Sequence, residues 1–241
     1  MLHYQIVDWQ ESKSASFAAA TTQGEFFEVL KTAAVEVGFE YCALGLLFPL
    51  PFSRPQVFMV NNYSAAWQQR YVDGDYLRSD PTVAHAKTSS KPVIWSDAVF
   101  ADAPALWDDA RDHRLHVGWA QPTHDLKGVA GLFTLARESV PIDQAELRAN
   151  VIRMTWLAQA AHEVLAQLVD ARPNAAPWQD LTEREREVLR WTGDGKTSGE
   201  IGDILNVAER TVNFHVNNAM LKLGTPNKTA TVLRAAMLRL L

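Results

Sequence analysis

The chain has 241 residues, of which 47% are hydrophobic and 21% are charged. These proportions are typical of globular folding into one large domain or two modest ones, and they exclude long disordered tracts. No apolar run reaches the roughly 18 residues of a membrane span, and the N-terminus lacks the pattern of a secretory signal. The single cysteine, Cys42, excludes a disulfide framework, so we expect a cytoplasmic protein.

The net charge of −5 is unevenly distributed. Residues 1–176 carry 14 basic and 20 acidic side chains, whereas residues 177–241 carry 9 and 8, a net of +1. From Val207 onward Glu209 is the one acidic residue, against Arg210, Lys222, Lys228, Arg234 and Arg239. Positive charge therefore lies where a surface that contacts DNA phosphates would need it, although a solvated basic face is also common without nucleic acid.

The first domain, which we place at residues 1–170, mixes helical and strand patterns. A Thr22-x-x-Glu25 capping box precedes apolar residues at helical spacing. We expect further helices at 64–71 and 104–113, strands at 41–48, 56–60, 92–95, 117–121 and 129–137, and a proline-rich loop at 49–55. One sheet covered by helices on its faces, an α/β/α sandwich, accommodates this order.

Residues 141–169 form a long helix candidate with a heptad-like seam. Its seven apolar members are spaced 4, 3, 4, 3, 4 and 3 residues apart: Leu147, Val151, Met154, Ala158, Ala161, Leu165 and Leu168. The seam is explained equally well by packing on the domain's own sheet and by pairing with a second subunit. Trp156 and Val164 lie off the seam and are free to pack elsewhere.

The segment from Asp170 to Asp180 contains Pro173 and Pro177, which resist helix formation, so we place a linker at 171–180. The second domain, residues 181–241, has an almost entirely helical pattern. Capping boxes at Thr182-x-x-Glu185 and Thr197-x-x-Glu200 open two helices, a third ends at Gly224, and a fourth covers 228–241. This all-α unit of four helices makes the whole chain an α+β protein.

The third of these helices divides into two faces. Val212, Val216, Ala219 and Leu223 form an inward apolar stripe, and Arg210, Asn213 and Asn217 lie outside it. In a helix-turn-helix such a polar face enters the major groove, where asparagine pairs with adenine and arginine with guanine or phosphate. An ordinary solvated helix face is the alternative.

The C-terminal stretch from Leu181 resembles the DNA-binding domain of the LuxR-type transcription regulators. The matching residues are Leu181, Thr182, Glu185, Glu187, Leu189, Gly195, Lys196, Ile201, Leu205, Thr211, Val212, His215, Lys222 and Leu223. The resemblance implies that Asn213 and Asn217 face bases. It also gives candidates for phosphate contact: Lys196, Thr211, His215, Lys222 and Lys228. Ala208 departs from the family's frequent serine, which puts the cap of that helix in doubt.

The N-terminal domain carries neither the paired acids of a phosphoreceiver nor a phosphate-binding GxxxxGK[ST] loop. It instead resembles the autoinducer-binding domain of acyl-homoserine-lactone receptors over roughly residues 25–165. The residues that carry the resemblance are Tyr63, Trp67, Tyr71, Asp80, Pro81, Trp95 and Gly118. The resemblance implies a small-molecule receptor that forms a homodimer on double-stranded DNA and contacts RNA polymerase.

An acyl-homoserine lactone requires one acceptor for its amide N–H, donors for two carbonyls, aromatic walls and an apolar tunnel. Asp80 is the expected acceptor, and the Trp67 indole and the Tyr63 hydroxyl are the expected donors. The remaining candidates are Thr134 at a position where the family often has a hydroxyl, Tyr71 and Trp95 as walls, and Leu106, Ala110 and Leu115 along the tail. The alternative is that these aromatics are ordinary core and that Asp80 caps the next helix.

Three functional hypotheses therefore compete. The leading one is a quorum-sensing regulator, the second a LuxR-type regulator with a different ligand or none, and the third an enzyme that hydrolyses an acyl lactone. We expect no enzyme, because no nucleophile-elbow sequence is present and nothing indicates an activated water. We also expect no cofactor and no metal, since His113-x-x-His116 has no third ligand nearby.

Overall fold

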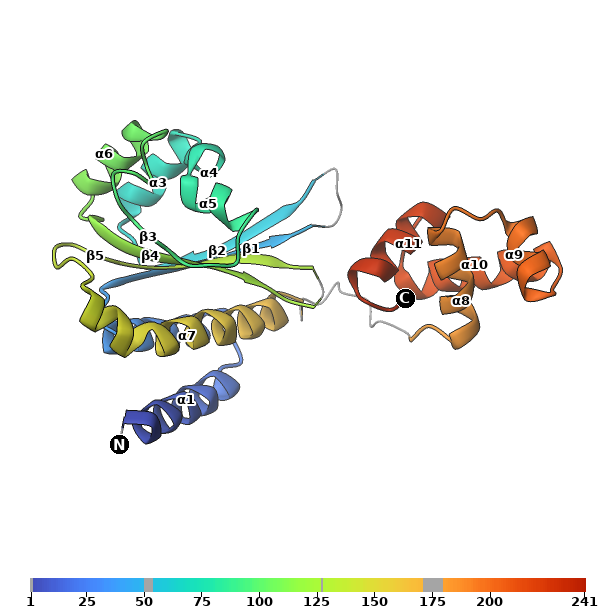
Figure 1. Ribbon diagram of the computed structural model, residues 1–241, viewed down its shortest axis with the longest axis horizontal. Helices are drawn as coiled ribbons and strands as arrows, with labels where there is room; N and C mark the ends of the chain where they lie inside the picture. The colour runs from blue at the N-terminus through green and yellow to red at the C-terminus, as the bar shows by residue number, and fades with distance from the viewer. Residues whose placement is uncertain (1, 50–53, 127, 171–179) are drawn as a thin grey trace. The chain divides into compact units, whose positions relative to one another are not determined.

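The computed structural model describes residues 2–49, 54–126, 128–170 and 180–241. These form two compact units, one with helices α1–α7 and a sheet, the other with helices α8–α11 (Figure 1). The predicted sandwich followed by a four-helix unit is confirmed. The predicted linker at 171–180 lies, except for Asp180, outside the described residues, as do positions 50–53 of the predicted loop.

The sheet of the first unit has the strand order β2-β1-β5-β4-β3, and every neighbouring pair is antiparallel. Its strands are β1 (Tyr41–Phe48), β2 (Gln56–Asn61), β3 (Val93–Ile94), β4 (Val117–His124) and β5 (Ala130–Arg137). The helices are α1 (Leu2–Ala19), α2 (Gln23–Glu36), α3 (Ala65–Asp73), α4 (Tyr76–Ser79), α5 (Pro81–Ala86), α6 (Pro104–Asp112) and α7 (Gln144–Asp170).

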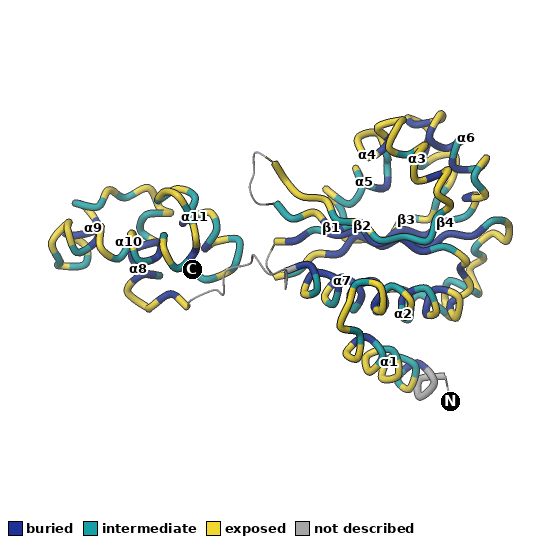
Figure 2. The backbone as a smooth tube through the Cα atoms, turned by 180° about the vertical axis from the view of Figure 1, so that it is seen from behind, coloured by how far each residue is buried: buried dark blue, intermediate teal, exposed yellow. Residues whose placement is uncertain are grey.

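Alternation along the strands gives the sheet two different faces. Leu44 and Leu46 of β1 and Phe133 and Leu135 of β5 belong to the main core, against α2 and α7. Ala136, one residue further along β5, belongs to a second cluster beneath α3–α6. The three central strands β1, β5 and β4 consequently lie mostly buried between two helical layers, whereas residues of the edge strands β2 and β3 are exposed (Figures 1 and 2).

The heptad-like seam of α7 packs on the domain's own sheet. Met154, Ala158, Ala161 and Leu165 are buried in the main core beside residues of β1 and β5. The explanation by packing within the domain is therefore confirmed for the middle of the seam. Pairing with a second subunit stays a prediction.

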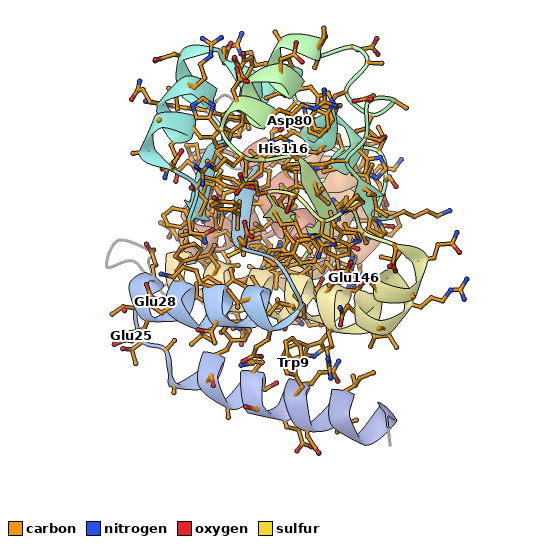
Figure 3. All side chains as sticks on the ribbon, turned by 90° about the vertical axis from the view of Figure 1, so that its left-hand side faces the viewer. Trp9, Glu25, Glu28, Asp80, His116 and Glu146 are labelled. Atoms are coloured by element: carbon orange, nitrogen blue, oxygen red, sulfur yellow. The ribbon has the colours of Figure 1, made fainter. Side chains whose placement is uncertain are left out.

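Helix α1 was not predicted from the sequence. It lies outside the α2–α7 layer, with the Trp9 ring edge-on to off-seam Trp156 at 5.6 Å (Figure 3). The Glu36 carboxylate of α2 accepts from the Trp9 indole and from Lys13, both at 2.6 Å. Because Lys13 interrupts the apolar stripe, the helix lacks the continuous period that sequence analysis detects.

Two predicted strands differ in length from the structure by more than one residue. β4 was expected to end at Gln121, yet it continues through Pro122 to His124. Pro122 pairs with Leu132 of β5, whereas β3 pairs with β4 only at Trp119 and Ala120. Proline is tolerated because that edge of β4 needs no backbone donor there. β3 is correspondingly shorter than the expected 92–95.

The second unit consists of α8 (Glu183–Gly193), α9 (Ser198–Leu205), α10 (Glu209–Leu223) and α11 (Lys228–Met237). Both predicted capping boxes form, at Thr182 and at Thr197. Ala208 supplies no side-chain cap to α10, as its departure from the family pattern indicated. Helix α11 ends at Met237 rather than at the predicted residue 241, with Asn227 capping its start.

Candidate functional site

A cluster of aromatic and apolar side chains covers the sheet face beneath α3–α6, and we call it the aromatic cluster. It brings together most of the residues predicted to hold a ligand: Tyr63, Trp67, Tyr71, Trp95, Leu106, Ala110 and Leu115. Thr134 belongs to the same face, since it lies two residues before Ala136 on β5. Asp80, the last predicted member, lies on this side of the sheet, opposite Trp9 (Figure 3).

Helix α3 supplies two of the aromatic rings. Its N-terminus is fixed by Ser64, whose hydroxyl accepts from the backbone N–H of Trp67. The rings of Trp67 and Tyr71 meet edge-on with centroids 5.7 Å apart, one helical turn from each other. Tyr76 of α4 stacks on Trp67 with a centroid separation of 6.3 Å.

Asp80 has two roles in the structure. Its Oδ1 accepts from the backbone N–H and the hydroxyl of Thr82, at 2.7 and 2.6 Å, which caps α5. Its Oδ2 accepts from the Tyr71 hydroxyl at 2.9 Å. The capping explanation is thus confirmed, and the same carboxylate reaches the aromatic cluster through Tyr71. Burial raises the pKa of Asp80, against the opposing effect of these hydrogen bonds.

Thr82 is a site residue that the sequence analysis missed. It is 2% exposed, and both its hydroxyl and its backbone N–H bind Asp80. Part of the signal was available, because an aspartate at a helix start commonly accepts from the backbone N–H two residues further on.

Several donors of the cluster have no acceptor among the described residues. The Trp95 indole nitrogen is buried and unpaired. Trp67, Tyr63 and Thr134 likewise make no side-chain hydrogen bond to another residue of the described ranges, and burial raises the pKa of the Tyr63 hydroxyl. A buried donor without a partner costs about 1–3 kcal/mol, so the Trp95 indole favours a polar ligand that can accept from it.

Gly118 of β4 explains how Trp95 fits. A Cβ built on Gly118 would lie 2.2 Å from the Trp95 ring, closer than any van der Waals contact allows. The Trp95 indole therefore rests directly on the backbone of β4, where Trp95 N also donates to the carbonyl of Gly118 at 2.9 Å. Trp95 and Gly118, which both carry the family resemblance, are therefore linked by one steric requirement: the indole fits only where residue 118 has no side chain.

Two carboxylates at the outer side of the cluster join its segments: Asp109 connects α6 with α3 and α4, and Asp97 connects the turn after β3 with α6. Asp109 of α6 accepts from Arg70 at 2.5 Å and from the Tyr76 hydroxyl. Asp97 accepts from the Trp107 indole at 2.7 Å and from Arg111. Sequence analysis identified neither, since the partners are 10 to 39 residues away along the chain.

The His113-x-x-His116 pair does not form a metal centre with other side chains of the described ranges. Those ranges contain no group of three or more His, Cys, Asp or Glu side chains that could hold an ion. Nδ1 of His113 bonds the carbonyl of Asp109 at 2.8 Å, and its ring lies 5.4 Å from that of Trp67. His113 is therefore part of the wall around Trp67.

Helix α10 presents the polar face that a nucleic-acid interface requires. Arg210, Asn213 and Asn217 are exposed, and Thr211 and His215 are partly buried at its sides. The stripe of Val212, Val216, Ala219 and Leu223 is buried as predicted. Ser198 of α9 donates to the Asn213 amide oxygen at 2.8 Å, which links the two helices of the predicted helix-turn-helix.

The three predicted phosphate-binding lysines have different surroundings. Lys196 and Lys228 both line a hollow of about 380 Å³ between the end of α8 and the start of α11. Lys222 instead donates to buried Glu185 at 2.8 Å and to the carbonyl of Asp180 at 3.1 Å. Lys222 therefore has a partner within its own domain. Contact of the three lysines with DNA phosphates stays a prediction.

A sheet with polar groups buried in an aromatic cluster, followed by a helix-turn-helix, defines a transcription regulator with a small-molecule-binding domain. Residues 22–165 match the autoinducer binding domain, and residues 179–235 match the bacterial regulatory proteins of the luxR family. The chain belongs to the LuxR-type regulators with an autoinducer-binding domain. Among the described residues, no helix has the length and apolar character to cross a membrane.

Relatives match over nearly the whole chain. The transcriptional activator protein AnoR of Acinetobacter nosocomialis is 43% identical, with 97% of this chain and 99% of AnoR covered. The quorum-sensing regulator RhlR of Pseudomonas aeruginosa is 35% identical, with 97% of this chain and 96% of RhlR covered. The crystal structure of Escherichia coli SdiA has a TM-score of 0.80, 32% identity and coverage of 97% and 98%. The structure of SdiA in complex with octanoyl-rac-glycerol has a TM-score of 0.78 and 32% identity, with 96% of this chain and 94% of SdiA covered.

Proposed function

We propose that this protein is a quorum-sensing transcription regulator that binds an N-acyl-homoserine lactone in the aromatic cluster. The observation that carries the proposal is the set of unpaired donors around a buried carboxylate. Asp80 accepts the ligand amide N–H, Trp67 donates to the lactone carbonyl and Tyr63 to the acyl carbonyl. Leu106, Ala110 and Leu115 enclose the tail, and each buried methylene contributes about 0.8 kcal/mol.

On the same proposal, the liganded chain acts as a cytoplasmic homodimer on double-stranded DNA. Two copies of α10 then enter the major groove at half-sites of a pseudo-palindrome, one or more helical turns apart. Activation follows through contact with RNA polymerase, in keeping with AnoR, which is a transcriptional activator protein.

A second candidate ligand has a specific observation in its favour. SdiA, at 32% identity, has been solved with octanoyl-rac-glycerol, which combines an acyl chain with hydroxyl groups instead of a lactone. Such a head group both donates and accepts hydrogen bonds. It would satisfy the same unpaired indole and hydroxyl groups, so an acylglycerol is the alternative input.

The test measures soluble yield and melting temperature of the full chain with acyl-homoserine lactones of increasing tail length and with octanoylglycerol. We expect both quantities to rise with one range of lactone tail lengths. A rise with octanoylglycerol alone identifies the second candidate, and no rise with any compound contradicts both. Recovery of intact lactone after prolonged incubation excludes the hydrolase hypothesis.

The Trp67→Phe variant tests the assigned head-group geometry. It removes one donor at similar volume, so we expect the half-maximal lactone concentration to rise about tenfold while soluble yield persists. Trp9→Phe is the matched control, because it removes an indole donor on the opposite side of the sheet, where Glu36 is the acceptor. An unchanged half-maximal concentration in Trp67→Phe contradicts the assignment.

A further inference from the structure

Helix α10 carries an aromatic side chain that its own domain does not use. Phe214 is 59% exposed, although the stripe from Val212 to Leu223 packs inward on the same helix. Its one ring contact among the described residues is with neighbouring His215, edge-on at 5.6 Å between centroids. The other apolar residues of this helix are buried, except for half-buried Met220 and exposed Leu221.

The position of Phe214 on the helix is specific. Arg210, Phe214, Asn217 and Leu221 are spaced 4, 3 and 4 residues apart, so they form one row along the helix. All four are exposed, and the row lies opposite the buried stripe. Phe214 therefore lies between Arg210, which is expected to contact guanine or phosphate, and Asn217, which is expected to face a base.

We propose that Phe214 recognises the 5-methyl group of a thymine, between the base pairs contacted by Arg210 and Asn217. This inference rests on the proposed function, since it assumes that α10 enters the major groove. The base edges in that groove present donors and acceptors, and the thymine methyl is their characteristic apolar group. Phe214 lies in the N-terminal half of α10, the part of a recognition helix that reaches base edges.

The experiment begins with enrichment of bound sequences from random double-stranded DNA. The full chain is purified with the lactone that raises its melting temperature most. Each thymine of the enriched operator is then replaced by uracil, which removes only the methyl group. We expect one position in each half-site at which this replacement weakens binding about fourfold, as expected for one methyl group buried against a ring.

The Phe214→Ala variant is then measured on both the thymine and the uracil operators. We expect it to weaken binding of the thymine operator by a similar factor and to make that position insensitive to uracil, because the two changes remove the same contact. Leu221→Ala is the matched control: it removes an 81% exposed side chain from the same row, about 10 Å further along the helix. We expect it to retain the response to uracil.

The possible results distinguish a failure of the Phe214 contact from a failure of the proposed DNA-binding function. If the wild-type chain binds an enriched operator but is indifferent to every uracil replacement, the inference is overturned and DNA recognition stands. It is equally overturned if Phe214→Ala weakens thymine and uracil operators to the same extent at every position. If no sequence is enriched at all, the proposed function fails and the inference fails with it.

Discussion

At the scale of single residues, the contact between Gly118 and Trp95 gives a direct test of the ligand site. Gly118→Ala places a methyl group inside the Trp95 ring, so the indole must leave the β4 backbone and enter the space of the aromatic cluster. We expect the lactone response to fall at least tenfold, with some loss of stability from overpacking. The measurement is the half-maximal lactone concentration.

Gly45→Ala is the matched control, because it adds the same methyl to β1 of the same sheet, where the new Cβ meets nothing within 4 Å. It should retain soluble yield. A Gly118→Ala protein with an unchanged lactone response would show that Trp95 does not line the ligand.

Residue identities at the site were predictable, but their partners were not. The aromatic residues on α3 and Asp80 follow from the family pattern, and they do lie on one face of the sheet. The hydrogen bond from Tyr71 to Asp80 and the ion pair of Arg70 with Asp109 join separate helices. Such contacts depend on how the helices pack, which local spacing does not determine.

At the scale of elements, helices with clear caps and apolar stripes were predicted well. The capping boxes of α2, α8 and α9 all form, because each depends on residues only three positions apart. Helices α4 and α5 were missed, since four and six residues are too few to show a period.

The start of α8 has a pH-dependent attachment to α10. Glu185 is 3% exposed and accepts from Lys222. Burial opposes its ionisation, but hydrogen bonds from Lys222 and Thr182 outweigh this and lower its pKa. Because the folded pKa lies below the unfolded one, the stabilisation is complete above the ordinary glutamate pKa of about 4.3. It is lost as pH falls through the lowered folded value.

We expect Glu185→Gln to destabilise the helical unit by about 1.5–3 kcal/mol at pH 7, the range for a hydrogen bond to a charged group. Thermal melts across pH 3 to 7 check this, and the difference from wild type should shrink as the pH falls below about 4. Glu187→Gln, which changes a half-exposed carboxylate that pairs with Arg184 at the surface, should show little effect at any pH. A Glu185→Gln difference that is constant with pH would argue against the assignment.

At the scale of the whole molecule, two separate cores define what a ligand can stabilise. The first unit contains the main core and the aromatic cluster, and the second contains its own clusters around Leu189 and Val212. A ligand that binds only the folded first unit stabilises it by RT ln(1 + [L]/Kd), or about 2.7 kcal/mol at one hundred times Kd.

We therefore expect calorimetry of the full chain to show two unfolding transitions, of which the lactone moves only one. Asp80→Asn should reduce that shift, because it weakens the acceptor for the ligand amide, and should leave the other transition in place.

Asn217→Ala gives the reciprocal test: it should weaken specific DNA binding while the lactone still raises the melting temperature of the first transition by the same amount. A single transition that moves as a whole with ligand would mean that the units unfold cooperatively, and linkage would then couple lactone binding to the stability of the DNA-binding helices directly.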